Sequence, residues 1–173
     1  MAARRLTLVG YRASGKTTLA HDLARLTGWR AVDLDVALVE RAGRDIPTIF
    51  AEDGEQRFRD LEAETLQAML ASADDLIIAT GGGIVERADN RVLLQQSARP
   101  VLYLAAPAAV LSARLQANQG DRPSLTGATV ADEVAAMLAR REPWYREVAD
   151  HELSTDQAWD QVVHAARAIV ENL

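Results

Sequence analysis

The residues most able to do chemistry form a phosphate-binding pattern near the start of the chain. Residues 10–17 read Gly-Tyr-Arg-Ala-Ser-Gly-Lys-Thr, which fits the spacing G-x-x-x-x-G-K-[ST]. Gly10 allows the chain to turn, and Gly15 lets backbone N–H groups approach phosphate oxygens closely. Lys16 would bridge the β- and γ-phosphates, and the Thr17 hydroxyl would bind Mg²⁺. The pattern therefore indicates a nucleoside triphosphate site, but it does not separate a kinase from a GTPase or an ATPase.

We expect the nucleotide contacts to come from the loop and the helix turn that follows it. The predicted contact residues are Tyr11, Arg12, Ala13, Ser14, Gly15, Lys16, Thr17 and Thr18. Lys16 is the only lysine in the chain, and the other 18 of the 19 basic residues are Arg. A compact ammonium that must fit between phosphate oxygens cannot be replaced by a planar guanidinium.

Two carboxylates, Asp33 and Asp35, stand at the end of the next apolar segment. In an extended chain, side chains two residues apart point the same way. One carboxylate could hold Mg²⁺, often through water, and the other could orient or deprotonate an attacking hydroxyl. The alternative is a helix N-cap beside a solvated acid.

Three further segments carry candidate binding residues. Arg59 and Glu62 have the spacing of a pair on one helix face, and such an arginine could grip a substrate carboxylate. Arg140 and Arg141 lie at the end of another predicted helix and are also candidate binding residues. The alternative is that their charges only complement the helix dipole. The run Gly81-Gly82-Gly83 favours a ligand that touches backbone, although a tight turn would explain one or two of these glycines.

Residues 121–127 form a polar segment that contains Arg122 and Pro123. A hinged loop of this kind could close over the phosphates, exclude water and bring an arginine to them. The alternative is a plain surface loop. The three histidines, His21, His151 and His164, show no spacing typical of metal ligands.

The elements that must position these residues alternate between strand and helix. Strands are predicted at 6–9, 30–33, 76–79, 101–104 and 152–154, and helices at 17–26, 35–42, 47–52, 55–71, 90–96, 108–117, 130–141 and 159–170. This order predicts an α/β fold, with a parallel sheet covered by helices on both faces. Ligands in such folds bind at the carboxyl ends of the strands, where the marked loops begin.

Bulk composition narrows the class of protein. The chain has 173 residues, 49% of them apolar, which predicts a single domain over residues 1–173. It has no cysteine, which excludes disulfides and thiolate metal sites and favours a cytoplasmic setting. No apolar stretch reaches the length of a signal peptide core or a membrane span. The net charge of −6 argues against general nucleic-acid binding.

Taken together, these segments resemble the shikimate kinase family. The resemblance covers residues 6 to about 154 and rests on these motifs: Gly-x-x-x-x-Gly-Lys-Thr at 10–17, Asp-x-Asp at 33–35, Phe-Arg-x-x-Glu at 58–62, Thr-Gly-Gly-Gly at 80–83, Arg-Pro-x-Leu-x-Gly at 122–127 and Arg-x-Pro-x-Tyr at 141–145. It implies the three-layer α-β-α fold of P-loop NTPases of the nucleoside monophosphate kinase type, with a five-stranded parallel sheet. It also implies a substrate-binding helical region at about 34–62 and a mobile lid at about 112–127.

The resemblance also implies residue roles. Asp35 would hold the reacting hydroxyl and act as base, and Arg59 and Arg141, rather than Arg140, would clamp the substrate carboxylate. Gly82 would offer backbone to a substrate hydroxyl, with Gly81 and Gly83 shaping the turn. Lys16, Asp35 and Arg122 would be catalytic, with Arg122 reaching the ATP phosphates from the lid, and Thr17 and Asp33 would hold Mg²⁺. Arg114 and residues near Thr155 are candidates for adenine contacts.

The implied activity is transfer of the ATP γ-phosphoryl group to the 3-hydroxyl of shikimate, giving shikimate 3-phosphate and ADP in aromatic amino-acid biosynthesis. We expect a cytoplasmic monomer that uses Mg²⁺ and has no nucleic-acid or membrane partner. One alternative is another small-molecule kinase of this fold, such as a gluconate kinase. A GTPase-like switch is a second alternative, although the chain lacks the Asn-Lys-x-Asp element that selects guanine.

Overall fold

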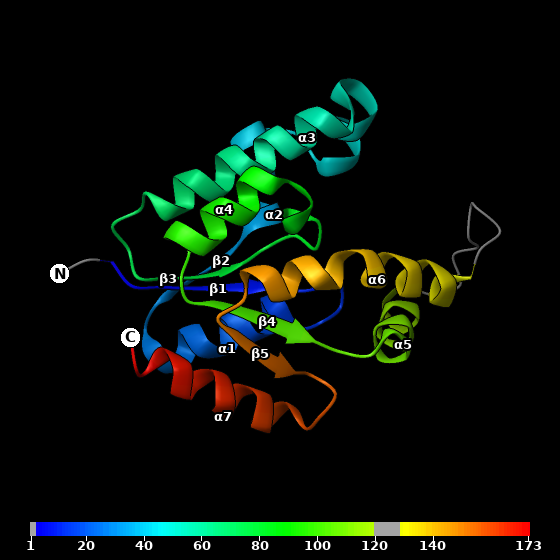
Figure 1. The fold of residues 1–173 in the computed structure, drawn as a ribbon. Helices are drawn as coiled ribbons and strands as arrows, with labels where there is room; N and C mark the ends of the chain where they lie inside the picture. Colours follow the sequence, from blue (N-terminus) through cyan, green and yellow to red (C-terminus); the bar gives the residue numbers. More distant parts are fainter. Residues whose placement is uncertain (1–2, 120–128) are drawn as a thin grey trace.

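The structure is a computed structural model that describes residues 3–119 and 129–173. Within these residues, helices and strands alternate along the chain (Figure 1). The strands are β1 (Arg5–Val9), β2 (Arg30–Asp33), β3 (Leu76–Ala79), β4 (Val101–Ala105) and β5 (His151–Ser154). The helices are α1 (Lys16–Thr27), α2 (Leu34–Ala42), α3 (Ile46–Leu70), the 3₁₀ helix η1 (Ile84–Glu86), α4 (Ala88–Ser97), α5 (Ala108–Gln119), α6 (Val130–Val148) and α7 (Trp159–Val170).

The strands of the described residues form one five-stranded parallel sheet in the order β2-β3-β1-β4-β5. The predicted α/β class and parallel sheet are therefore confirmed. Strand β3 is buried along its whole length, as expected for a strand that is covered by helices on both faces. Because all the strands run the same way, their carboxyl ends meet at one edge, and the loops that carry the candidate residues begin there.

Side chains alternate between the two faces of the sheet and pack into two separate hydrophobic cores, one on each face. On one face, Leu8 of β1 and Leu102 of β4 pack with α1 and α7. On the other face, Ile78 of β3 and Tyr103 of β4 pack with residues of α3, α4, α5 and α6. Figure 1 shows α1 and α7 on one side of the sheet and α3, α4 and α6 on the other. The packing of these three layers fixes the position of the sheet edge at the carboxyl ends of the strands, where the candidate residues lie.

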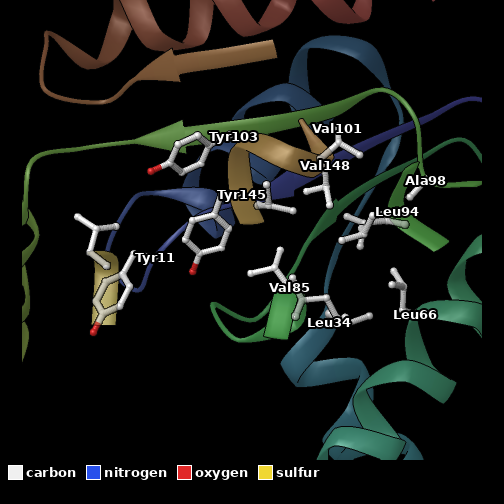
Figure 2. Close-up of a cluster of buried hydrophobic side chains, with 14 of the residues drawn as sticks. Tyr11, Leu34, Leu66, Val85, Leu94, Ala98, Val101, Tyr103, Tyr145 and Val148 are labelled. Carbon is white, nitrogen blue, oxygen red and sulfur yellow. The ribbon is translucent and has the colours of Figure 1, made fainter. Parts of the chain in front are cut away.

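Helix α6 is longer than the sequence predicted. The helix was expected to end at Arg141, but it continues through Pro143 to Val148. Tyr145 and Val148 extend the buried face of the helix into the core, so tertiary packing outweighs the backbone hydrogen bond that Pro143 cannot donate. The Tyr145 ring stacks on Tyr103, with ring centroids 5.2 Å apart (Figure 2).

Helix α3 joins two segments that the sequence separated at Gly54. Gly54 has φ 80° and ψ 174°, which are not helical angles, so the helix bends sharply there. The part after the bend carries Arg59 and Glu62 toward the sheet edge, while the part before it packs Ile49 against Phe58. In the described part of the chain, no helix has both the length and the apolar character needed to span a membrane.

Candidate active site

The phosphate-binding pattern forms the loop between β1 and α1. Gly10 (φ 147°), Ala13 (φ 61°) and Gly15 (φ 96°) all have positive φ, and this backbone path wraps the loop around the Lys16 side chain. Lys16 Nζ donates hydrogen bonds to the backbone oxygens of Gly10 and Tyr11, both at 2.8 Å. The loop therefore fixes the ammonium at the start of α1, where free backbone N–H groups also favour anions.

Lys16 is 8% exposed, and this burial lowers its pKa to about 8. The charges of Asp35 and Asp33 act in the opposite direction and raise that pKa. A second buried polar group lies in the loop, since the Ser14 Oγ has no hydrogen-bond partner among the described residues. The loop thus holds a nearly buried cation and an unsatisfied hydroxyl, which suit an anionic oxygen-rich ligand.

Asp33 and Thr17 are brought together at the loop. Thr17 Oγ1 donates a 2.7 Å hydrogen bond to Asp33 Oδ2, while Asp33 Oδ1 caps α2 by accepting from the backbone N–H groups of Asp35 and Val36. The two oxygens of this pair are hard donors of the kind that Mg²⁺ prefers. Asp33 is therefore the N-cap of α2, as the alternative interpretation of this pair expected for one of the two acids.

Asp35 lies in the first turn of α2 rather than in an extended chain. The reasoning that placed Asp33 and Asp35 on one strand face was therefore wrong, because the helix begins at Leu34, between them. Burial and the charge of Asp33 raise the pKa of Asp35, against the charges of Lys16 and Arg59. Both carboxylates nevertheless act on Lys16, so the end of β2 does supply two acids to the phosphate loop.

Two of the three glycines after β3 make room for charged side chains. A Cβ on Gly81 would lie 2.8 Å from Asp35 Oδ1 and 2.9 Å from Glu62 Oε1, and a Cβ on Gly83 would clash with the Arg59 guanidinium. None of the three glycines has positive φ, which argues against a tight turn as their reason. The sequence suggested that a ligand approaches the glycine backbone closely. At Gly81 and Gly83, the groups that approach closely are side chains of this chain.

Arg59 is held by carboxylates on several sides. Its Nη1 donates to Glu62 Oε2 at 3.0 Å, and its Nη2 lies 3.4 Å from both Glu55 Oε1 and Glu86 Oε2. The predicted pairing of Arg59 with Glu62 on one helix face is confirmed. Glu62 is 1% exposed, and burial raises its pKa, although the charge and hydrogen bond of Arg59 oppose that shift.

Arg141 reaches the same place from α6. Its Nε and Nη2 lie 2.8 and 2.7 Å from Glu86 Oε1, so Glu86 contacts both arginines. Arg140, the neighbour, lies over the Trp144 ring and does not line the same cavity as Arg141, although its charge also helps to lower the pKa of Glu86. The Tyr145 hydroxyl donates a hydrogen bond to the Gly82 backbone oxygen and thereby connects α6 to the glycine turn.

These groups line one cavity of about 380 Å³ beside the phosphate loop. Its lining residues are Tyr11, Arg12, Asp35, Ile46, Phe50, Phe58, Arg59, Glu62, Gly81, Gly82, Gly83, Met137 and Arg141. The cavity combines three arginines with apolar and aromatic walls, a composition that suits a small ring carrying an anionic group. Asp35 lies on its wall and also acts electrostatically on Lys16, so the cavity adjoins the predicted nucleotide site.

A second hollow of about 380 Å³ also adjoins the loop, lined by Ala13, Gly15, Thr18, Arg114, Ala117 and Trp159. Arg114 donates to Thr155 Oγ1 at 3.2 Å and to its backbone oxygen at 2.6 Å, so the two predicted adenine residues contact each other. A Cβ on Gly15 would lie 2.8 Å from the Trp159 ring. An aromatic wall beside the phosphate loop suits the face of a nucleotide base.

Arg122 and the second half of the predicted lid, residues 120–127, lie outside the described residues. The residues in or beside these pockets that were not found from the sequence include Glu86, Tyr145 as a hydrogen-bond donor, and Trp159. Each contacts residues that are distant along the chain, and no local spacing in the sequence predicts those contacts. The position of Glu86, three residues after Gly83, was the nearest available signal.

Known proteins match both the sequence and the fold. The family model described as "Shikimate kinase" matches residues 12–171. A shikimate kinase of Nitratidesulfovibrio vulgaris is 46% identical over 88% of this chain and 87% of its own length, and one of Oleidesulfovibrio alaskensis is 48% identical over 85% and 86%. The solved shikimate kinase of Acinetobacter baumannii in complex with shikimate has a TM-score of 0.84 at 33% identity, covering 98% of this chain and 94% of that one.

Proposed function

The chain belongs to the shikimate kinase family, and we propose that it binds shikimate in the cavity lined by Arg59 and Arg141, next to ATP held by the phosphate loop. It is an ATP-dependent kinase that transfers the γ-phosphoryl group to the 3-hydroxyl of shikimate, giving shikimate 3-phosphate and ADP. The observation that carries the assignment of the cavity is its charge pattern: two arginines from separate helices face one small pocket that also contains Asp35.

ATP is gripped mainly by the backbone of the loop and by Lys16. The pKa of about 8 leaves most of the Lys16 ammonium protonated at neutral pH, so it can neutralise charge on the phosphate oxygens. The hollow beside Trp159 and Arg114 adjoins Ala13 and Gly15 of the loop, whereas the cavity adjoins Tyr11 and Arg12, and we propose that this hollow holds adenine. This order supports an in-line transfer, with the base, the phosphates and the acceptor in sequence.

Shikimate is oriented by its carboxylate and by its reacting hydroxyl. Arg59 and Arg141 would bind the carboxylate, because guanidinium groups match its planar geometry. Asp35 would accept the hydrogen of the 3-hydroxyl, and the rise of its pKa brings it closer to the range of a useful general base. Gly82 would offer backbone to another hydroxyl. Catalysis would then consist mainly of positioning and charge stabilisation.

We propose that Thr17 and Asp33 hold Mg²⁺ together with the phosphates. Their oxygens, 2.7 Å apart at the edge of the loop, fit a hard cation, and the described residues contain no cluster of three or more acidic or histidine ligands that would form a separate cage. When bound, Mg²⁺ would neutralise phosphate charge. Thr17 and Asp33 would orient it through their hydroxyl and carboxylate oxygens.

The family resemblance supports Arg122, which lies outside the described residues, as the cation that a lid at about 112–127 brings to the phosphates. It also supports a single domain over residues 1–173 with a substrate-binding region at about 34–62. We further propose a monomer that works in the cytoplasm without a nucleic-acid or membrane partner. The net charge of −6 supports the absence of general nucleic-acid binding.

ATP consumption measured with shikimate, with D-gluconate and with no acceptor tests this function. We expect ADP release that depends on shikimate, and a product whose NMR spectrum places the phosphate on the 3-hydroxyl. Turnover with gluconate alone would favour the other small-molecule kinase. Slow hydrolysis that no acceptor changes, together with tight GTP binding, would favour a nucleotide switch.

A further inference from the structure

Glu86 is a carboxylate of this chain that contacts both arginines of the proposed substrate clamp, although it is not itself among the residues that line the cavity. It comes from η1, directly after the glycine turn, and lies between a guanidinium of α3 and a guanidinium of α6. Its Oε1 accepts from Arg141 and its Oε2 faces Arg59 at 3.4 Å, so its two oxygens contact one arginine each. This is the contact pattern that the carboxylate of a bound acid would make with the same pair.

The three groups are almost withdrawn from solvent, which makes this contact stronger than a surface ion pair. The side chains of Arg59 and Glu86 are each 14% exposed and that of Arg141 is 12% exposed. Burial works to raise the pKa of Glu86, but the hydrogen bond and charge of Arg141 and the charge of Arg59 outweigh it and hold that pKa below its ordinary value. Glu86 therefore remains an anion under working conditions.

A second anion that enters this pocket meets carboxylates as well as arginines. Arg59 already pairs with the buried Glu62, and Arg141 already pairs with Glu86. A substrate carboxylate placed between the arginines would lie within a few ångströms of Glu86, where like charges repel strongly in a partly buried site. It can bind only by sharing the guanidinium N–H groups with Glu86 or by displacing it.

We propose that Glu86 is a positioning residue that holds Arg59 and Arg141 together across the pocket and competes with the carboxylate of shikimate for them, thereby weakening substrate binding. The inference rests on the proposed function, because it takes these arginines as the shikimate clamp. It assigns to Glu86 control of shikimate affinity without direct participation in phosphoryl transfer.

Replacing the charge while keeping the shape tests the proposal. Glu86→Gln retains the size of the side chain but removes the competing anion. We expect the Kd of shikimate, measured by calorimetry without nucleotide, and the shikimate KM to fall by about three- to tenfold. The ATP KM should change less than about twofold, since Glu86 lies outside the nucleotide hollow.

Thermal unfolding gives a second readout that separates competition from simple loss of structure. Without Glu86, the two arginines lose a shared counter-charge, so the ligand-free Glu86→Gln variant should melt at a lower temperature than the wild type. The rise in melting temperature on adding saturating shikimate should be larger than in the wild type, because the ligand now supplies the missing charge. If Glu86 only supported the fold, its replacement would lower the melting temperatures with and without shikimate by similar amounts.

Glu55→Gln is the matched control. It removes a carboxylate at the same 3.4 Å distance from the same Arg59 nitrogen, but Glu55 is 64% exposed and makes its ion pair with Arg59 rather than Arg141. We expect less than about a twofold change in shikimate affinity, because solvent screens this pair. Glu86→Asp keeps the charge on a shorter side chain that cannot contact both arginines, and its affinity should lie between those of the wild type and Glu86→Gln.

Weaker or unchanged shikimate binding in Glu86→Gln would overturn the competition, provided that Arg59→Ala weakens shikimate binding selectively. Should Arg59→Ala leave shikimate binding unchanged, the clamp itself would be wrong, and the role of Glu86 would fall with it. Absence of shikimate-dependent ADP release by the wild type would instead contradict the proposed function. The three failures are therefore distinguishable.

Discussion

The phosphate loop is one contiguous stretch, residues 10–18, whereas the substrate cavity combines Tyr11 and Arg12 of that loop with residues of α2, α3, the glycine turn and α6. The loop fixes Lys16 with two backbone oxygens. In the cavity, Arg59 pairs with Glu62 of its own helix, and Glu86 of η1 contacts both Arg59 and Arg141. The nucleotide grip is thus a local property of the chain, and the substrate grip is a property of tertiary packing.

This difference has a functional consequence. Damage to the loop should remove the chemistry itself, because the reacting phosphates are held there. Damage to one arginine or carboxylate of the cavity should weaken recognition of shikimate and leave the nucleotide grip intact.

Lys16→Met should reduce kcat by about a thousandfold or more, because the ammonium that neutralises the phosphate oxygens is lost. The fold should persist, since the apolar Met side chain suits the nearly buried position of Lys16. Steady-state kinetics and far-UV circular dichroism check both parts. Retention of a tenth of the wild-type kcat would show that the loop cation is not needed for transfer.

Arg59→Ala should raise the shikimate KM by about 30-fold or more, because cutting one side of a buried charged contact costs about 2–5 kcal/mol. The ATP KM should change little. Arg57→Ala is the matched control, because Arg57 lies on the same helix but pairs with Glu64 at the surface. Equal shifts of both KM values in Arg59→Ala would contradict the division between the two regions.

Gly81→Ala should lower kcat/KM for shikimate by about 10- to 100-fold, because the new methyl group must displace the carboxylates of Asp35 and Glu62. Gly43→Ala provides the comparison. Gly43 has φ 66° and open space around its Cβ position, so it should lose about 1 kcal/mol of stability and keep its kinetics. Normal kinetics in Gly81→Ala would mean that the position of Asp35 is not critical.

The low pKa of Lys16 predicts a dependence on pH. kcat/KM for ATP should fall by about tenfold per pH unit above pH 8, as the free enzyme loses the ammonium. The free energy of unfolding should change in the opposite direction to kcat/KM. Between about 8 and the ordinary value of 10.5, the unfolded chain binds more protons at Lys16 than the folded chain does, so the free energy of unfolding rises with pH in that window.

Lys16→Met separates this effect from the titration of other groups. Denaturant unfolding between pH 8 and 10.5 should show the wild type gaining stability relative to Lys16→Met. Parallel stability curves for the two proteins would show that burial does not depress the pKa of Lys16.

Trp159→Ala should raise the ATP KM several-fold, since stacking of a base on an aromatic ring is worth about 1–3 kcal/mol and Arg114 remains in the hollow. The shikimate KM should stay the same. Trp159→Phe keeps a ring but loses the 2.7 Å hydrogen bond to Asp22, so its effect should be smaller. A larger shift in the shikimate KM than in the ATP KM would place adenine elsewhere.

The same contrast explains what could be predicted from the sequence. The sheet and the phosphate loop depend on local patterns, such as the buried run Leu76–Ala79 and the glycine spacing around Lys16, and both were predicted. The pairing of Arg59 with Glu62 also followed from helix spacing. Each of these features needs only residues that are close together in the chain.

Features that depend on distant contacts were missed. Glu86 meets Arg141 across 55 residues, and Tyr145 meets Gly82 across 63, so no window of sequence contains either contact. The continuation of α6 past Pro143 rests on the packing of Tyr145 and Val148 in the core. The geometry of Asp35 was mistaken because the start of α2 at Leu34 was placed one residue too late.

A crystal structure with shikimate and a non-hydrolysable ATP analogue tests the central claim most directly. We predict that the ring carboxylate lies between Arg59 and Arg141, while the 3-hydroxyl lies within hydrogen-bond distance of Asp35 and faces the γ-phosphate. Electron density that shows both arginines turned away from Asp35, with shikimate bound elsewhere, would contradict the account.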